Sequence, residues 1–258
     1  MTPVARRSPA VPIALALFAL LVIAQLAYPQ VPAAWVDRMT VLTVLLFLGA
    51  SVAAAWARSG PRFALALAGL GFLVGYLSEV VGVATGFPFS EYLYTERLQP
   101  QLLDVPIVIP LAWAMMAYPA WRVGELVGST PVARAVVAAG ALTAWDVALD
   151  PQMVGIGYWE WPNGGAYVGI PLVNFLGWFA VGLVLFGWWA LVARVPHVPS
   201  RRSLVDALGP LLYAWTWIGE TVAHALFFAG WGVAIASFAA MGVFAVPALL
   251  RLRAGEPG

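Results

Sequence analysis

The stretch FALALAGLGFLVGYLSEVVGVAT, residues 63–85, is long and apolar and contains one charged side chain, Glu79. About 20 apolar residues are enough for an α-helix to cross the ~30 Å hydrocarbon layer of a bilayer. A charge near the centre of such a helix costs ~2.5–3.5 kcal/mol on insertion scales and tends to mark a functional site. The stretch therefore predicts a membrane helix with a polar site inside it.

The composition of the whole chain agrees with this interpretation. Of the 258 residues, 62% are hydrophobic and only 10% are charged, which is typical of an integral membrane protein. Cysteine is absent, which excludes disulfides and thiolate chemistry. Every basic residue is arginine, which excludes a lysine Schiff base, and the net charge of +1 implies no nucleic-acid partner.

Seven further stretches have the same character, so the sequence predicts an all-α, polytopic membrane bundle of about eight transmembrane helices. The expected spans are 10–28, 39–57, 63–85, 105–127, 132–149, 170–193, 204–227 and 230–250. They form a single membrane domain over residues 1–258, with short tails at 1–9 and 251–258. Gly230 is the only break between the last two spans, so a seven-helix alternative stays open.

The placement of arginine predicts the orientation of the bundle. With eight spans and both termini in the cytoplasm, only Arg38 and Arg97 lie on the outer side. The arginines on the inner side are Arg6, Arg7, Arg58, Arg62, Arg122, Arg134, Arg194, Arg201, Arg202, Arg251 and Arg253. This asymmetry follows the positive-inside rule and predicts a multi-pass protein of the plasma membrane.

Two long connections then lie outside, and both are rich in aromatic residues, glycine and proline. Residues 86–104 read GFPFSEYLYTERLQPQLLD, and the second connection, 150–169, begins DPQMVGIGYWEWPNGG. Such segments suit a cap over a cavity. The alternative is an aromatic belt at the membrane interface, where tryptophan and tyrosine normally collect.

Polar side chains from several spans fall at one depth, on the outer side of the bundle. They are Glu79, Asp104, Asp146, Asp150, Asn174, Glu220 and His224. Asp146 and Asp150 are four residues apart and share a helix face, as do Glu220 and His224. A histidine beside a carboxylate is held in one tautomer. Two carboxylates in a low-dielectric site repel each other as anions, so one of them retains a proton.

Each of these residues also has a structural interpretation. Glu220 and His224 could form a buried hydrogen-bonded pair, and Asp150 could end a helix because it precedes Pro151. We expect Arg122 and Glu125 to form a structural ion pair at the inner face. His197, between prolines in an arginine-rich loop, is expected to be solvated.

Other chemistries find little support in the chain. It has no metal-protease, redox-dithiol or nucleotide-binding motif, and its two histidines lie on opposite faces, so we predict no metal and no cofactor. A transporter remains a rival, since intramembrane carboxylates also mark substrate paths. The polar groups gather at one face of the membrane, which makes a continuous path less favoured.

Two ordered motifs resemble the membrane carotenoid-biosynthesis family that includes the carotenoid 1′,2′-hydratases and the bisanhydrobacterioruberin hydratases. The first is VGVATGFPFSEYLYTERLQPQLLDVPIVIPLAWAMMAY at 81–118, and the second is TAWDVALDPQMVGIGYWEWPNGGAYVGIPLVNFLGWF at 143–179. The matching positions are Glu79, Tyr92, Pro106, Trp113, Asp146, Asp150, Pro151, Trp159, Trp161, Gly169, Pro171, Asn174 and Trp178. Ser90 departs from the pattern, because the family resemblance leads us to expect glycine after Phe89.

The resemblance implies addition of water to the terminal C1′=C2′ double bond of an acyclic carotenoid such as lycopene or γ-carotene, giving a tertiary alcohol without a cofactor. This chemistry needs a buried acid, stabilisation of a tertiary cation and one positioned water. We assign Asp146 as proton donor with Asp150 as its partner, Glu79 or Asn174 to the water, and Glu220 and His224 to support. The residues expected to contact substrate are Tyr92, Asp104, Trp113, Trp159, Trp161 and Trp178, and the aromatic faces of the four tryptophans favour a cation.

Two alternatives share much of this reasoning. A carotene cyclase would make the same cation and let an internal alkene capture it instead of water. A transporter or carotenoid-binding protein would leave the pigment unchanged. The partners implied are the carotenoid, water and the bilayer, with other carotenoid-pathway enzymes as candidates.

Overall fold

The computed structural model of the protein describes residues 9–192 and 203–255. Six residues named in the sequence analysis lie outside these ranges. They are Arg6, Arg7, Arg194, His197, Arg201 and Arg202.

The described residues form an all-α bundle of eight helices, as predicted. The helices are α1 (Ala10–Ala27), α2 (Val36–Ser59), α3 (Pro61–Thr85), α4 (Val108–Val127), α5 (Pro131–Ile156), α6 (Leu172–Gly187), α7 (Leu204–Leu226) and α8 (Trp231–Ala254). Short 3₁₀ turns at Tyr28–Gln30 and Ala33–Trp35 link α1 to α2, and a π-helical turn at Trp188–Val192 follows α6. Gly230 has a φ of 83° and separates α7 from α8, so the seven-helix alternative is wrong.

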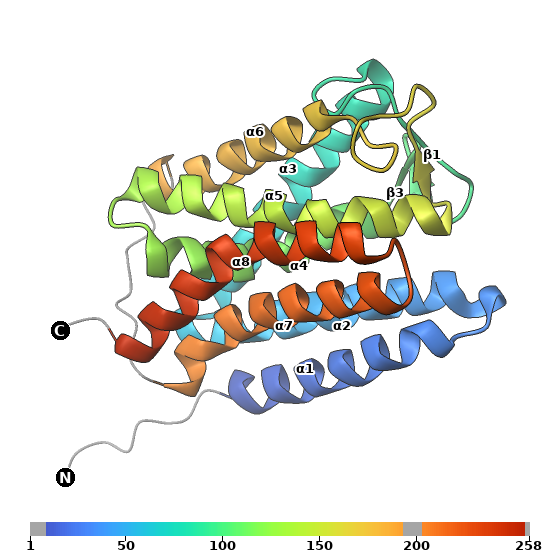
Figure 1. Cartoon of the computed structure of the whole chain (residues 1–258). Coiled ribbons are helices and arrows are strands. Elements are labelled where there is room, and N and C mark those ends of the chain that lie inside the picture. Colours follow the sequence, from blue (N-terminus) through green and yellow to red (C-terminus); the bar gives the residue numbers. More distant parts are fainter. Residues whose placement is uncertain (1–8, 193–202, 256–258) are drawn as a thin grey trace, which may run out of the picture.

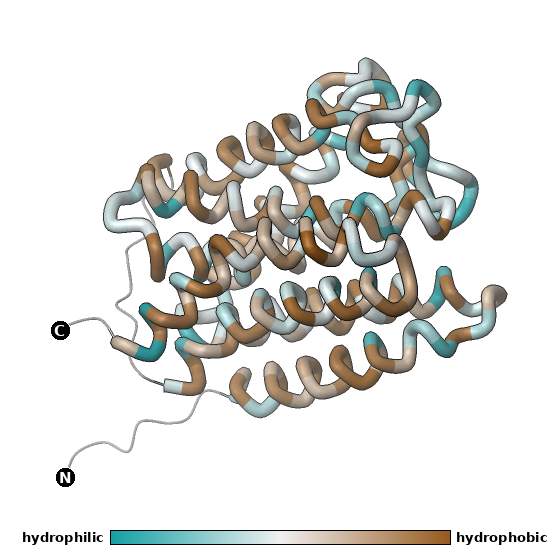
Figure 2. Tube along the Cα trace, in the orientation of Figure 1, coloured by the Kyte–Doolittle hydropathy of each residue, from teal (hydrophilic) through white to brown (hydrophobic). Residues whose placement is uncertain are grey.

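Six of the eight described helices are long and apolar enough to cross a membrane on their own, and α4 and α7 are the two that are not. In Figure 1 the helices run side by side, with α4 among them and the two long connections gathered at one end. Nearly every residue of α4 is buried, so its Arg122 and Glu125 are shielded from lipid by neighbouring helices. Figure 2 shows the outer helices as mostly hydrophobic, with the hydrophilic positions concentrated toward their ends and in the loops.

Helix α5 is longer than the span 132–149 expected from the sequence. Asp150 does not terminate the helix before Pro151, which is a correction: α5 runs on to Ile156 and ends at Gly157, whose φ is 81°. A proline inside a helix removes the hydrogen bond to the carbonyl four residues earlier, here that of Val147. The Tyr167 hydroxyl donates to this carbonyl at 3.0 Å, which replaces the missing bond and lets the helix continue.

The two long connections, 86–107 and 157–171, pack together as one body, which we call the cap. Strand β1 (Leu93–Tyr94) pairs antiparallel with β4 (Trp159–Glu160), with Leu93 opposite Glu160. Within the first connection, β2 (Gln101–Leu102) pairs with β3 (Val105–Pro106). The cap lies over one end of the bundle, and α1 begins and α8 ends at the opposite end (Figure 1).

Candidate functional site

A cavity of about 400 Å³ lies beneath the cap, between the ends of the helices. Its wall is mainly aromatic and aliphatic, with a few carboxyl, amide and hydroxyl groups. Nine of the twelve predicted site residues line it: Glu79, Tyr92, Trp113, Asp150, Trp159, Trp161, Asn174, Trp178 and Glu220. The structure thus brings residues from five helices and both connections to one site, with the volume and composition of a small-molecule pocket.

Glu79 is held by three donors. The hydroxyl groups of Tyr92 and Tyr94 donate to its Oε2 at 2.5 and 2.7 Å, and Trp113 Nε1 donates to its Oε1 at 3.1 Å. Burial and the neighbouring Glu79 raise the pKa of Tyr92 and that of Tyr94, so both phenols keep their protons and act as donors. Three donors from the cap and α4 thus fix the orientation of the Glu79 carboxyl group at the cavity wall.

Asp146 and Asp150 meet at one amide group. Asn174 Nδ2, near the start of α6, donates to Asp146 Oδ2 at 2.9 Å and to Asp150 Oδ2 at 2.6 Å. Trp159 Nε1 from the cap donates to Asp150 Oδ1 at 3.1 Å. Asp150 lines the cavity, whereas Asp146 is fully buried behind it and is not part of the wall.

A tryptophan stack forms the wall between these two groups of carboxyls. The rings of Trp113 and Trp178 are stacked, with centroids 4.0 Å apart and planes 10° from parallel, and Trp145 meets Trp178 edge-on at 6.1 Å. Gly75 of α3 makes room for the stack, because a Cβ at this position would overlap the Trp113 ring. Aromatic faces in this position would stabilise a cation in the cavity.

His224 and Glu220 do not form the hydrogen-bonded pair considered from their spacing. His224 Nε2 lies 3.9 Å from Glu220 Oε2 but 2.8 Å from the Ala148 carbonyl, which can only accept. His224 Nδ1 accepts from Ala229 N–H at 3.4 Å, so the ring is neutral with its proton on Nε2. His224 therefore ties α7 to α5 behind the cavity, and Glu220 faces the cavity without it.

Asp104 is the remaining predicted residue that the structure does not bring to the cavity. It is exposed at the turn between β2 and β3, with a φ of 60°. At the other end of the bundle, Arg122 and Glu125 form the predicted ion pair, and Arg58 extends it to Asp206.

Tyr94 and Trp145 line the site but were not predicted. Tyr94 follows Tyr92 by two residues, the spacing at which strand side chains share a face, so alternation in the first connection could have indicated it. Trp145 immediately precedes Asp146 and belongs to the same turn of α5. Nothing in the sequence alone sets it apart from the other tryptophans.

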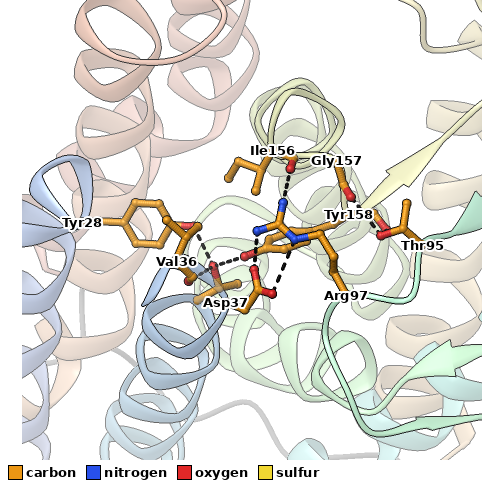
Figure 3. Close-up of polar contacts among 9 residues, drawn as sticks. Tyr28, Val36, Asp37, Thr95, Arg97, Ile156, Gly157 and Tyr158 are labelled. Atoms are coloured by element: carbon orange, nitrogen blue, oxygen red, sulfur yellow. Dashed lines mark hydrogen bonds and ion pairs between the residues drawn. The ribbon is translucent and has the colours of Figure 1, made fainter. Parts of the chain in front are cut away.

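A latch at one edge of the cap fastens it to the helix ends, and Figure 3 shows its residues. The Arg97 guanidinium pairs with Asp37 at the start of α2 and donates to the Ile156 carbonyl at the end of α5. It also lies over the Tyr158 ring, with its central carbon 4.7 Å from the ring centroid. The Tyr158 hydroxyl bonds Thr40 at 2.8 Å, and Thr40 lines the cavity. The latch therefore links the cap to the cavity wall.

Comparisons with known proteins give the site its context. The model of a family described as carotenoid biosynthesis protein matches residues 39–247. A bisanhydrobacterioruberin hydratase of Haloarcula japonica is 36% identical over 131 residues, which cover 48% of this chain and 43% of that protein. The chain thus aligns with less than half the length of this curated relative. No solved structure matches the chain.

Proposed function

This chain belongs to the carotenoid biosynthesis protein family, which confirms the resemblance noted in its sequence, and we propose that it is a carotenoid hydratase. The reaction would add water to the C1′=C2′ double bond of an acyclic end group, as in lycopene or γ-carotene. The observation that carries the proposal is a buried carboxyl pair at the wall of an aromatic cavity in a membrane bundle. The relative's printed name, a hydratase, supports the reaction type.

We assign the proton to the Asp146–Asp150 pair rather than to one residue. The two side chains accept from the same Asn174 amide group, and two carboxyl groups held together in a buried site repel each other as anions, so sharing one proton is favoured. From the sequence and the resemblance we expected Asp146 to be the donor, but Asp150 is the member that lines the cavity. In the proposed step Asp150 transfers its proton to C2′. Asp146 and Asn174 hold the Asp150 side chain in place.

Protonation at C2′ leaves a tertiary cation at C1′, which the other wall would stabilise. The carboxyl oxygens of Glu79 would supply oriented negative dipoles, and the stacked Trp113 and Trp178 rings would supply aromatic faces. A water oriented by Glu79 or Asn174 adds to C1′ through oxygen. Its released proton returns to the Asp146–Asp150 pair, so the pair is restored and no cofactor is consumed.

The remaining residues would shape the pocket. Tyr92, Trp159 and Trp161 enclose the end group from the cap. Glu220 would bind a water within the cavity, and His224 would support it through α5. The proposed setting is the plasma membrane, where the carotenoid and the bilayer are the partners and other enzymes of the pathway are candidates.

Expression in a bacterium that accumulates lycopene tests the proposal. The extracted pigment would be separated by chromatography and weighed by mass spectrometry. Hydration gives a product heavier by one water, and Asp150→Asn and Asp146→Asn should both abolish it while the protein remains in the membrane. A new product of unchanged mass would point instead to a cyclase, and unchanged lycopene would point to another substrate or to transport.

A further inference from the structure

The cavity reaches the surface of the bundle between α1 and α7. Most of the residues that line it are buried or half-buried, and the exposed ones are all apolar and lie at the end of α1, in the last three turns of α7 and just after α7. They are Leu26, Ile218, Val222 and Phe227. Leu26 is 66% exposed and Phe227 51%, so side chains of the cavity wall continue onto the outer surface of the bundle.

Small residues line the α7 side of this opening. Gly219 and Ala223 lie one turn apart on the face of α7 that lines the cavity. A Cβ at Gly219 would only touch Trp215, at 4.0 Å, so space remains beyond it. Trp215 Nε1 donates to Gln25 Oε1 at 2.6 Å and so joins α7 to α1 beside the opening. Figure 1 shows α1 and α7 as neighbours along one side of the bundle.

We infer that the carotenoid enters and leaves the cavity sideways from the lipid, through the opening between α1 and α7. The inference rests on the proposed function, since it takes a long apolar polyene as the molecule that moves. An apolar rim at the lipid-facing surface suits a substrate that is dissolved in the hydrocarbon layer. At the cap, by contrast, the Arg97 latch and the β1–β4 pair fasten the chain over the cavity.

A larger side chain at Gly219 tests the path. Phenylalanine at this position would place a ring in the opening, where a Cβ meets only Trp215. We expect Gly219→Phe to lower kcat/KM for lycopene at least about tenfold, because the ring occupies the passage. Gly69→Phe is the matched control: Gly69 is exposed on α3 with no atom within 4 Å of a Cβ, and we expect wild-type turnover.

Labelling supplies a second test that does not depend on turnover. The chain has no cysteine, so Gly219→Cys and Gly69→Cys each introduce a single thiol. In detergent micelles, added lycopene should slow the reaction of N-phenylmaleimide with Gly219→Cys several-fold and leave that of Gly69→Cys unchanged. This arm remains informative if the phenylalanine variant fails to fold.

The two tests separate the path from the reaction. Protection of Gly219→Cys by lycopene without any hydration by the wild type would support the opening and overturn the hydratase proposal. Hydration by the wild type with a fully active Gly219→Phe variant and no protection of the thiol would overturn the opening and leave the hydratase proposal standing.

Discussion

At the scale of single residues, Asp150 and Asp146 share one amide donor but differ in what they face. Asp150 contacts the cavity and Asp146 contacts only protein. We expect Asp150→Asn to lower the rate of hydration by about 10²–10⁴, the range of a lost general acid, because an amide cannot deliver the proton. The measurement is product formation by purified protein in detergent micelles.

Asp146→Asn is the informative comparison for this prediction. It keeps the side-chain shape and leaves Asp150 in the cavity, but removes the partner with which the proton is shared. We expect a large loss here too, with the melting temperature of both variants near that of the wild type. A wild-type rate for Asp150→Asn would remove the pair from the mechanism.

Ser90 stands where the resemblance led us to expect glycine, and its backbone has a conformation that favours glycine. Its φ is 74°, in the left-handed region that glycine adopts without a steric cost, so the cap keeps a glycine-like backbone with a serine in it. We expect Ser90→Gly to stabilise the protein by about 1 kcal/mol, which is the steric cost of this region for a side chain. Thermal unfolding followed by tryptophan fluorescence measures it, and a lowered melting temperature would contradict the strain.

The residue pattern predicted most of the site but not the direction in which each group points. The i,i+4 spacing placed Asp146 and Asp150 on one face of a helix, and the shared Asn174 amide confirms this. Which carboxyl contacts the cavity depends on the rotation of α5 against α6 and α7. Spacing also paired His224 with Glu220, whereas a carbonyl on another helix binds His224 instead. Contacts between helices decide which carboxyl faces the cavity and which group binds His224. The spacing of residues within one helix gives no information about such contacts.

At the scale of elements, Pro151 and Tyr167 should be energetically coupled. Tyr167→Phe leaves the Val147 carbonyl without its donor and should cost about 1–3 kcal/mol, the cost of a buried unsatisfied group. Burial and the nearby Asp146 raise the pKa of Tyr167 to about 12, so its hydroxyl donates over the whole accessible pH range. In a Pro151→Ala background the new N–H can bond Val147, and the cost of Tyr167→Phe should fall.

The double-mutant cycle over these two positions measures this coupling by denaturation of the purified protein. Equal costs of Tyr167→Phe in both backgrounds would mean that the hydroxyl does not replace the helix bond. The same contact explains why the end of α5 was predicted too early. A proline normally ends a helix, and the compensating hydroxyl lies in a connection that follows later in the chain.

Helices α3 and α4 approach closely at Gly75, where the tryptophan stack is built. We expect Gly75→Ala to displace Trp113 and so weaken both its stack with Trp178 and its bond to Glu79. Overpacking of this kind costs about 1–3 kcal/mol, and activity should fall with stability. Gly69→Ala on the lipid-facing side of α3 is the control and should be neutral or slightly stabilising. Unchanged activity in Gly75→Ala would show that the stack is not needed.

At the scale of the whole molecule, the length and apolar character of the stretches were enough to predict eight helices, six of which are long and apolar enough to cross a membrane on their own. It could not predict the cap as a folded unit. The pairing of Leu93 with Glu160 joins connections far apart in the chain, and each strand is only two residues long. Such short strands carry no sequence signal of their own. They form because the ends of α3, α4, α5 and α6 bring the two connections together.

The orientation of the bundle is the last prediction, and it rests on the arginine asymmetry. The absence of cysteine allows single thiols to report the side of the membrane. Asn163→Cys places one at an exposed position of the cap, and Ser129→Cys places one in the exposed loop between α4 and α5 at the other end.

In intact spheroplasts a membrane-impermeant maleimide should label Asn163→Cys at once and Ser129→Cys only after lysis. The reverse pattern would place the cap, and the carboxyl groups beneath it, on the cytoplasmic side. The proposed reaction would survive that result, because its substrate is reached from the lipid, whereas the positive-inside argument would not.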